Sequence, residues 1–354
     1  MEGKLQSLTC LKTCADQLAP IFSQIFNRTS PDPYWTPLQF AYRANRSVDD
    51  AVNMGLHFIL QHLDKSGTYV RILFVDFSSA FNTIIPNLLL QKLTQLSVPT
   101  SICQWITSFL TERQQLVKLG KYSSSTRTIS TGAPQGCVLS PLLFSLYTND
   151  CSSKDPSVKL LKFADDTTII GLIQDGDESA YRQEVKELAV WCSHNNLELN
   201  TLKTVEMTDL KWDIHIDAIV KKAQQRLFFL RQLRKFNLPQ ELLKQFYTAI
   251  IESVLCTSIT VWFSSATKSD LRRPHWTVRT AERIIGTTLH TLQELYLSRV
   301  SKKAGKITLD PSHPAHSLSE LLPSGRRYRA LSTRTARHRN SFFPQAIHLM
   351  NTSQ

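Results

Sequence analysis

Residues 159–170 read Lys-Leu-Leu-Lys-Phe-Ala-Asp-Asp-Thr-Thr-Ile-Ile and place two adjacent aspartates, Asp165 and Asp166, between two short apolar runs. Short apolar runs that meet at a polar dipeptide predict a β-hairpin with the carboxylates at its tip. Two ionised carboxylates about 5 Å apart repel each other by roughly 3 kcal/mol at an effective dielectric constant of about 20. A fold that holds them together therefore raises one pKa or supplies a cation. An ordinary Asx-rich turn is the alternative for an isolated pair, and the rest of the chain decides between them.

A third carboxylate lies at the end of a predicted buried strand. Residues 70–77 form a nearly continuous apolar run with β-branched members, which is typical of such a strand, and Asp76 closes it. An acid in this position is costly unless it is paired or bound to a metal. Phe81 follows five residues later, in a segment that turns away from the strand.

Two further stretches carry polar residues at special positions. Residues 132–141 form a loop rich in glycine and proline, with Gln135 and Gly136 near its centre, that leads into a helix expected at 141–149 with Ser140 as its N-cap. Bare backbone before a helix N-terminus suits anionic ligands, although any tight loop before a helix has this composition. Residues 197–207 alternate partly and predict a strand with one central lysine, Lys203.

Four motifs follow one another along the chain. They are residues 74–83 (Phe-Val-Asp-Phe-Ser-Ser-Ala-Phe-Asn-Thr), 133–136 (Ala-Pro-Gln-Gly), 163–166 (Phe-Ala-Asp-Asp) and 199–204 (Leu-Asn-Thr-Leu-Lys-Thr). With these motifs in this order, the chain resembles the reverse transcriptases of LINE-type (non-LTR) retrotransposons, specifically over about 39–207 and more loosely to 340. The resemblance implies an α+β fold: a right-hand polymerase palm, with an antiparallel sheet and helices, followed by a mostly helical, basic C-terminal region.

The same resemblance implies roles for individual residues. Asp76, Asp165 and Asp166 would be catalytic and would bind two Mg²⁺ ions roughly 3.5–4 Å apart, with Mn²⁺ as a substitute. Lys203 would be a general acid for the pyrophosphate, and an exposed strand lysine is the alternative interpretation. Phe81 would exclude a 2′-hydroxyl from the incoming nucleotide. The residues expected to bind the nucleotide are Phe77, Phe81, Gln135, Gly136 and Arg43.

The implied activity is RNA-directed DNA polymerisation, in which nucleotidyl transfer extends a primer 3′-hydroxyl. The expected partners are an RNA template, a DNA primer and dNTPs, with no membrane and no small organic cofactor; protein partners are not predicted. Two parts of the family pattern are short here. A proline-rich connector at 27–37 replaces a long fingers segment, and residues 207–211 lead to the next helix without a primer-grip hairpin. A catalytically inactive, nucleic-acid-binding retroelement remnant is therefore the alternative function.

The net charge of +12 is unevenly distributed. Residues 211–354 hold 23 Lys/Arg against 9 Asp/Glu, a balance of +14, whereas residues 1–210 hold 18 against 20, a balance of −2. This asymmetry indicates a polyanionic partner, nucleic acid before membrane, with a merely basic surface as the alternative. The C-terminal tail predicts either a nucleic-acid-binding arm or a disordered segment. Its arginines include Arg326, Arg327, Arg329, Arg334 and Arg337.

The pattern divides the chain into three expected parts. Residues 1–36 would form an N-terminal helix at 5–27 and the proline-rich connector, as a remnant of the fingers. Residues 37–207 would form the palm with partial fingers. Residues 208–354 would form a basic, helical, thumb-like and C-terminal region. The seven cysteines show no metal-binding spacing. No signal segment or membrane span is recognisable, so we expect an intracellular protein of the nucleus and/or cytoplasm that is not secreted.

Overall fold

The computed structural model describes residues 35–137, 139–207 and 210–352, and the helix predicted at 5–27 lies outside these ranges. The chain divides into two compact units. Of the described residues, the first unit comprises 35–51, 66–137, 139–207 and 310–314, and the second comprises 52–65, 210–309 and 315–352. The three-part division expected from the sequence stays a prediction.

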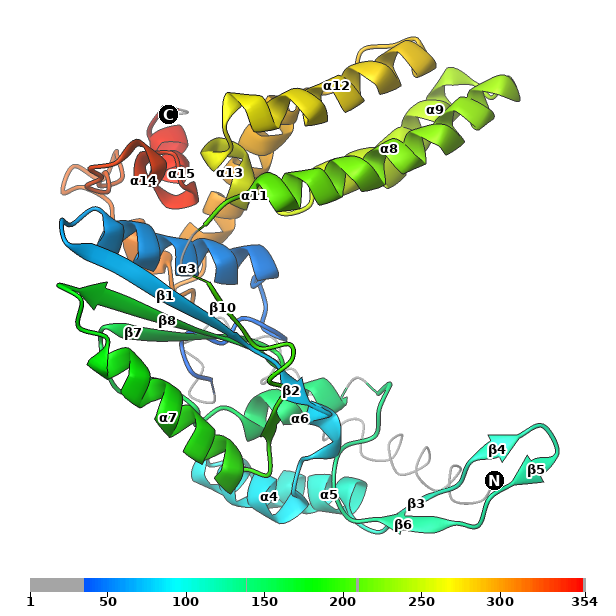
Figure 1. Ribbon diagram of the computed structural model, residues 1–354, viewed down its shortest axis with the longest axis vertical. Helices are drawn as coiled ribbons and strands as arrows, with labels where there is room; N and C mark the ends of the chain where they lie inside the picture. The colour runs from blue at the N-terminus through cyan, green and yellow to red at the C-terminus, as the bar shows by residue number, and fades with distance from the viewer. Residues whose placement is uncertain (1–34, 138, 208–209, 353–354) are drawn as a thin grey trace. The chain divides into compact units, whose positions relative to one another are not determined.

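The first unit is built on a four-stranded antiparallel sheet in the order β10-β1-β8-β7 (Figure 1). The central strands are β1 (Thr68–Val75) and β8 (Asp166–Gln174), which pair along the whole of β1. A hairpin joins β8 to β7 (Val158–Phe163), and β10 (Val205–Met207) pairs with the other edge of β1. The predicted antiparallel sheet and the predicted hairpin are therefore present.

Four helices share the hydrophobic core of the first unit with this sheet. They are α4 (Pro86–Gln95), α5 (Thr100–Leu110), α6 (Leu139–Tyr147) and α7 (Ser179–His194). Pro86 occupies the first turn of α4, where its missing N–H costs nothing. Apolar residues of each helix face the core-facing side chains of the strands, so the sheet is covered by helices as expected for a palm.

The start of α6 differs from the expectation. The helix begins at Leu139, two residues earlier than predicted, so Ser140 lies inside it and is not its N-cap. Its hydroxyl group donates instead to the carbonyl oxygen of Pro134, at 2.6 Å. This bond folds the preceding loop back on the first turn of the helix.

The strand predicted at 197–207 is wrong as a single element. The structure has a two-residue strand, β9 (Glu198–Leu199), that pairs with β2 (Phe77–Ser78), and then a turn before β10. The chain bends there because β9 and β10 belong to two different sheets. Lys203 consequently lies in a turn and not in a strand.

A two-stranded ribbon, here called the arm (residues 113–129), follows α5. Its inner ladder joins β3 (Arg113–Gln115) to β6 (Arg127–Ile129), and its outer ladder joins β4 (Lys118–Leu119) to β5 (Tyr122–Ser123). The apolar residues of the outer ladder are exposed: Leu119 by 79% and Tyr122 by 69%.

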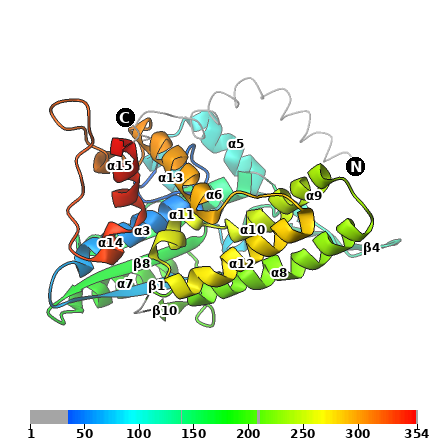
Figure 2. The same cartoon turned by 90° about the horizontal axis from the view of Figure 1, so that it is seen from above.

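The second unit is helical in its described residues. Its elements are most of α3 (Val48–Leu63), α8 (Asp213–Lys235), α9 (Gln240–Phe246), the π-helical η2 (Tyr247–Glu252), α10 (Ser253–Leu255), α11 (Ile259–Trp262), α12 (Lys268–Ile285), α13 (Leu292–Thr308), α14 (Ala336–Arg339) and α15 (Phe342–Thr352). The long helices α8 and α12 lie side by side (Figures 1 and 2). The predicted mostly helical C-terminal region is therefore present.

A capping box begins α13: the Thr291 side chain accepts from the Glu294 N–H, and the Glu294 carboxylate accepts from the Thr291 N–H. The helix continues through Gly305 to Thr308, because a glycine inside a helix costs only about 1 kcal/mol relative to alanine. No single helix in the described ranges has the length and hydropathy to span a membrane. The helices Gln240–Leu255 and Ile259–Ser265, which are bent relative to each other, have the required length and hydropathy only when they are taken together.

Candidate active site

The three aspartates come together because of the register of the sheet. Val75, the last residue of β1, pairs with Thr167 on β8, so Asp76 follows opposite the start of that strand. Asp166 is the first residue of β8 and pairs with Phe163 across the hairpin. The turn between them is formed by Ala164 and Asp165, and Ala164 has a φ of 60°. A backbone conformation that is uncommon for alanine thus sets the direction of the two carboxylates.

Asp76 and Asp165 line one pocket of about 510 Å³ at this end of the sheet. The other lining residues come from the segment after β1, the glycine- and proline-rich loop and the turn after β9. They are Phe77, Ser78, Ser79, Ala80, Phe81, Asn82, Gln135, Asn200 and Lys203. Six of the residues singled out in the sequence therefore share one cavity, although they are separated by up to 127 positions in the chain.

The electrostatics of the pocket follow from the crowding of the carboxylates. Burial raises the pKa of Asp166, and the charges of Asp165 and Asp76 raise it further. Burial raises the pKa of Tyr42, and the charge of Asp165 raises it further. The repulsion expected from two adjacent aspartates is therefore present and involves a third.

The donor set has few protein ligands for a metal. In the described ranges, no group of three or more His, Cys, Asp and Glu side chains converges closely enough to enclose an ion. Mg²⁺ nevertheless binds commonly through one or two carboxylates, with waters and substrate phosphates completing its octahedron. Two carboxylates on the wall of an open pocket, with a third close enough to feel their charge, fit that mode of binding.

The turn after β9 wraps around Asp76. Its main chain is held by Asn200, whose N–H donates to the Asp76 carbonyl oxygen at 2.9 Å, and by the Thr204 hydroxyl, which accepts from the Asp76 N–H at 3.5 Å. The Lys203 ammonium lies 3.7 Å from Asp76 Oδ2, with 71% of its side chain exposed. Lys203 is thus beside the carboxylate, and it is held loosely.

Aromatic rings form the inner wall. Phe81 lies in a short 3₁₀ turn, Ala80–Asn82, and its ring centroid is 5.5 Å from that of Phe144 on α6. Phe77 is buried and packs against the same ring at 6.2 Å. Phe144 therefore supports both aromatic residues that the sequence assigns to the nucleotide.

The glycine- and proline-rich loop is attached to the Phe81 turn. Gly132 donates to the Ile84 carbonyl oxygen and Ala133 donates to the Phe81 carbonyl oxygen, both at 2.7 Å. Gly132 has a φ of +76°, and a Cβ atom there would lie 2.7 Å from Asn82 Cα, so no other residue fits without a shift. The Gln135 amide donates to Asn82 Oδ1 at 3.2 Å, which fixes its side chain at the pocket.

Other residues assigned from the sequence lie elsewhere. Gly136 has a φ of +77° in the same loop but does not line the pocket, and neither does Asp166. Arg43 donates to the carbonyl oxygen of Gln39 at 3.4 Å and is also outside the pocket wall.

The arginines of the tail belong to the second unit, where all five are exposed. Their segment is packed in this structure. Asp64 accepts from the backbone N–H of Arg334 at 2.9 Å, Arg329 pairs with Glu320 at 3.9 Å, and Arg337 donates to a carbonyl oxygen of Leu210. The choice between a nucleic-acid-binding arm and a disordered tail stays a prediction.

Sequence reasoning missed several residues that shape the site. Asn82 and Asn200 are within the quoted motifs, yet their partners become visible only when the loops are folded. Tyr42 directly precedes Arg43, and its proximity to Asp165 has no local signal. Lys162 stands in the first quoted stretch, but one lysine within a short apolar run gives no reason to single it out.

Comparison with known proteins identifies related chains. The family model described as reverse transcriptase (RNA-dependent DNA polymerase) matches residues 9–230, and a model described as alkylated DNA repair protein alkB homolog 8, N-terminal, matches only residues 212–253. The probable RNA-directed DNA polymerase from transposon BS of Drosophila melanogaster is 26% identical over 324 residues, covering 76% of this chain and 35% of that protein.

Other similarities cover less or are weaker. The RNA-directed DNA polymerase from mobile element jockey of Drosophila melanogaster is 26% identical over 179 residues, 48% of this chain and 19% of its own length. The chain thus spans about a third or less of these relatives. A telomerase structure from Candida tropicalis, in complex with a fragment of telomeric RNA, aligns with a TM-score of 0.46 at 13% identity, over 83% of this chain and 54% of that one.

Proposed function

The chain belongs to the reverse transcriptase family, of the LINE (non-LTR) type, and from this premise we propose that it is an RNA-directed DNA polymerase. It would extend the 3′-hydroxyl of a DNA primer along an RNA template, with dNTPs as substrates. One observation carries the proposal: Asp76 and Asp165 share a pocket with Phe81 and Gln135, which the family resemblance assigns to the metal ions and the nucleotide.

Reverse transcriptases generally use divalent metal ions, and the carboxylates here fit that requirement. Asp76 and Asp165 would hold two Mg²⁺ ions, or Mn²⁺ in their place, with Asp166 supporting them through its charge. Bound ions would lower the pKa of the primer hydroxyl and stabilise the departing pyrophosphate. Positive charge at this point would also relieve the repulsion that raises the pKa of Asp166.

The remaining pocket residues would bind and orient the substrate. The largely exposed Lys203 side chain would turn from Asp76 to a phosphate, where its ammonium would protonate the pyrophosphate as a general acid. The Phe81 ring, supported by Phe144, would lie under the sugar and exclude a 2′-hydroxyl. Gln135, held by Asn82, would contact the nucleotide together with the backbone around Gly136.

The basic residues of the second unit would bind nucleic-acid phosphates. The exposed arginines at 326, 327, 329, 334 and 337 supply charge without base-reading geometry, so their binding would be independent of sequence. Affinity for RNA should fall steeply with salt, because each neutralised phosphate releases counterions.

Primer extension on an RNA template, with four dNTPs and Mg²⁺, tests the proposal. Asp165→Ala should lower the extension rate by roughly a thousandfold, since metal ions supply several kcal/mol and each 1.36 kcal/mol is a factor of ten. The matched control is Asp175→Ala, which removes a carboxylate just beyond the opposite end of β8. It should leave extension unchanged.

Two outcomes would overturn this assignment. If Asp165→Ala extends as well as the parent chain, the polymerase site is elsewhere. If the parent chain is folded and binds RNA but extends no primer under any divalent ion, the protein is a nucleic-acid-binding remnant of a polymerase.

A further inference from the structure

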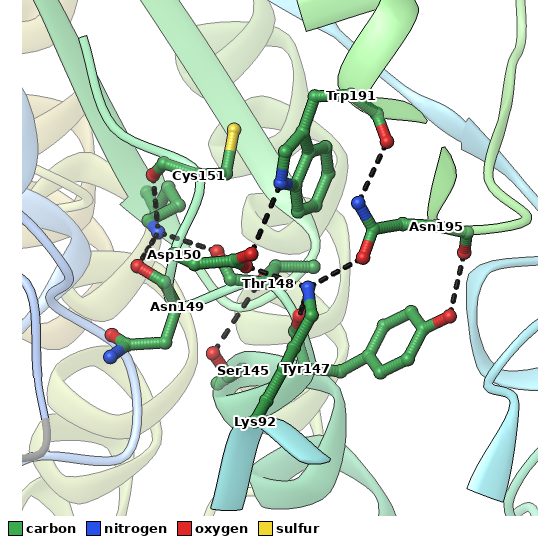
Figure 3. A network of polar contacts seen from close by, with 10 residues as sticks. Lys92, Ser145, Tyr147, Thr148, Asn149, Asp150, Cys151, Trp191 and Asn195 are labelled. Carbon is green, nitrogen blue, oxygen red and sulfur yellow. Dashed lines mark hydrogen bonds and ion pairs between the residues drawn. The ribbon is translucent and has the colours of Figure 1, made fainter. Parts of the chain in front are cut away.

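Two buried lysines meet at the C-terminal end of α6. The last carbonyl groups of a helix have no partner inside the helix and carry the negative end of its dipole. Here the Lys92 ammonium donates to the Tyr147 carbonyl oxygen at 2.7 Å, and the Lys162 ammonium donates to those of Thr148 and Cys151, both at 2.9 Å. Figure 3 shows this helix end with the groups around Lys92. Cationic side chains thus satisfy successive carbonyl groups where the helix stops.

The two lysines differ in what else they contact. Lys92 also donates to Asp150 at 2.7 Å and to Asn195 Oδ1 at 2.5 Å, and it lies over the rings of Tyr147 and Trp191. Lys162 is 2% exposed, and its partners in the described part of the chain are main-chain oxygens, including that of Asn149 at 3.4 Å. Among the described residues, no carboxylate is in direct contact with this buried cation.

The position of Lys162 on its strand is unusual for a charged residue. It stands on the same face of β7 as Val158 and Leu160, which belong to the hydrophobic core of the first unit. Burial lowers its pKa to about 8, against the raising influence of Cys151 and Asp150. An apolar side chain would avoid the cost of desolvation here. It would, however, remove the donor to the Cys151 carbonyl oxygen and one of the two donors to that of Thr148, which also accepts from the Cys151 N–H at 3.1 Å.

The main chain of Lys162 holds a second segment. Its N–H donates to the Leu38 carbonyl oxygen, and its own carbonyl oxygen accepts from the Phe40 N–H, both at 2.9 Å. Phe40 is fully buried, and the chain proceeds from it to Tyr42, which lies near Asp165. Lys162 therefore joins three elements at one point: the end of α6, the strand β7 and the segment at 38–42.

We propose that Lys162 is a positioning residue that fixes the Asp165–Asp166 turn to the end of α6. The turn begins two residues after Lys162, so the strand transmits any displacement of that side chain to the carboxylates. The proposal rests on the proposed polymerase function for its kinetic consequence, whereas its structural consequence is independent of activity. Lys92, which satisfies the same helix end from α4, provides a matched comparison.

Amide hydrogen exchange on the full chain, with Lys162→Met and Lys92→Met, separates the two lysines. Both variants should unfold at a lower temperature, because each leaves buried carbonyl groups without donors. Only Lys162→Met should increase exchange of the amides at 163–168, by about tenfold, while those of α7 stay protected. Equal exchange of this turn in both variants would show that Lys162 stabilises the core and positions nothing.

Primer extension provides the second measurement. Lys162→Met should lower kcat by about ten- to a hundredfold and leave the affinity for primer–template unchanged, since a displacement of about 1 Å at reacting groups has an effect of that size. Lys92→Met should retain kcat per folded molecule. An unchanged kcat for Lys162→Met, in a parent chain that is active, would refute the positioning role.

The proposal stays testable if Lys162→Met does not fold or if the parent chain is inactive. If Lys162→Met does not fold, Lys162→Arg takes its place, because it keeps the charge but moves the donors, and faster exchange at 163–168 is again expected. If the parent chain extends no primer, the polymerase proposal fails, and the exchange result alone decides whether Lys162 fixes the turn.

Discussion

The first unit contains two hairpins, β7–β8 and the arm, that differ in how much of their strands is buried. The β7–β8 hairpin has strands of six and nine residues, and most of their side chains are buried. The arm has strands of two or three residues, and Leu119 and Tyr122 at its outer ladder are largely exposed. One hairpin ends in crowded carboxylates, whereas the other ends in Gly120 and Lys121.

The difference teaches what a functional turn requires. Carboxylates that repel each other stay together only if the strands that carry them are fixed, and β7 and β8 are fixed by the core and by Lys162. The arm holds no carboxylates that repel each other, because residues 113–149 contain no Asp or Glu. Its tip therefore needs no support against repulsion. Burial beneath the strands therefore distinguishes the two hairpins better than their turn residues do.

The largest expected effect contrasts one leucine from each hairpin. Leu160→Ala on β7 should lower the free energy of unfolding by about 2–5 kcal/mol, because it opens a cavity in the core. Leu119→Ala in the arm should change it by less than about 0.5 kcal/mol, since that side chain is 79% exposed. Urea unfolding measures both, and similar losses would remove the distinction between the hairpins.

A smaller effect is expected from Gly171 in the middle of β8. A Cβ atom there would lie 2.7 Å from the ring of Tyr181, whose hydroxyl donates to Glu206 at 2.7 Å. Gly171→Ala should therefore cost about 1–3 kcal/mol of unfolding free energy through overpacking. Gly305→Ala is the control: it lies inside α13 with open space around it, and it should stabilise the protein slightly. A neutral Gly171→Ala would show that β8 is less rigid than its packing indicates.

The smallest effect concerns the pH dependence of stability. The pKa of Asp166 is raised in the folded protein by burial and by Asp165 and Asp76, so the folded state holds its proton more tightly than the unfolded state. Stability should consequently fall as the pH rises from the ordinary aspartate pKa through the raised pKa of Asp166 in the folded protein. Asp166→Asn should remove this slope and stabilise the metal-free protein at pH 7. Thermal unfolding between pH 4 and pH 7 measures it, and parallel curves would contradict the assigned cause.

Much of the first unit could be predicted because its signals are local. The apolar run before Asp76, the hairpin with its aspartates and the helix after Pro86 each follow from residue types within a short window. The contacts that complete the site are not local. The Gln135 amide donates to Asn82 Oδ1 across 53 positions, and the Lys203 ammonium lies 3.7 Å from Asp76 although the two residues belong to different motifs.

The errors have the same physical origin. The pattern at 197–207 alternates like a strand, but the chain must leave one sheet for another, and the turn that carries Lys203 is the result. The role of Lys162 could not be predicted from the sequence, because its partners are backbone carbonyl groups, which are present at every residue. Sequence reasoning identifies side chains that chemistry requires and misses those whose partners are backbone.

The closeness of Gly132 to the Phe81 turn has a consequence for how this chain tolerates change over time. Any side chain at position 132 would meet backbone atoms of Phe81 and Asn82, and backbone cannot move aside as a flexible side chain can. Most single-nucleotide changes in that codon would therefore damage the pocket, whereas changes at the exposed Lys121 of the arm, 11 residues upstream, would have little effect. In copies of this gene whose sequences have diverged, a glycine retained at position 132 would indicate that the pocket can still form.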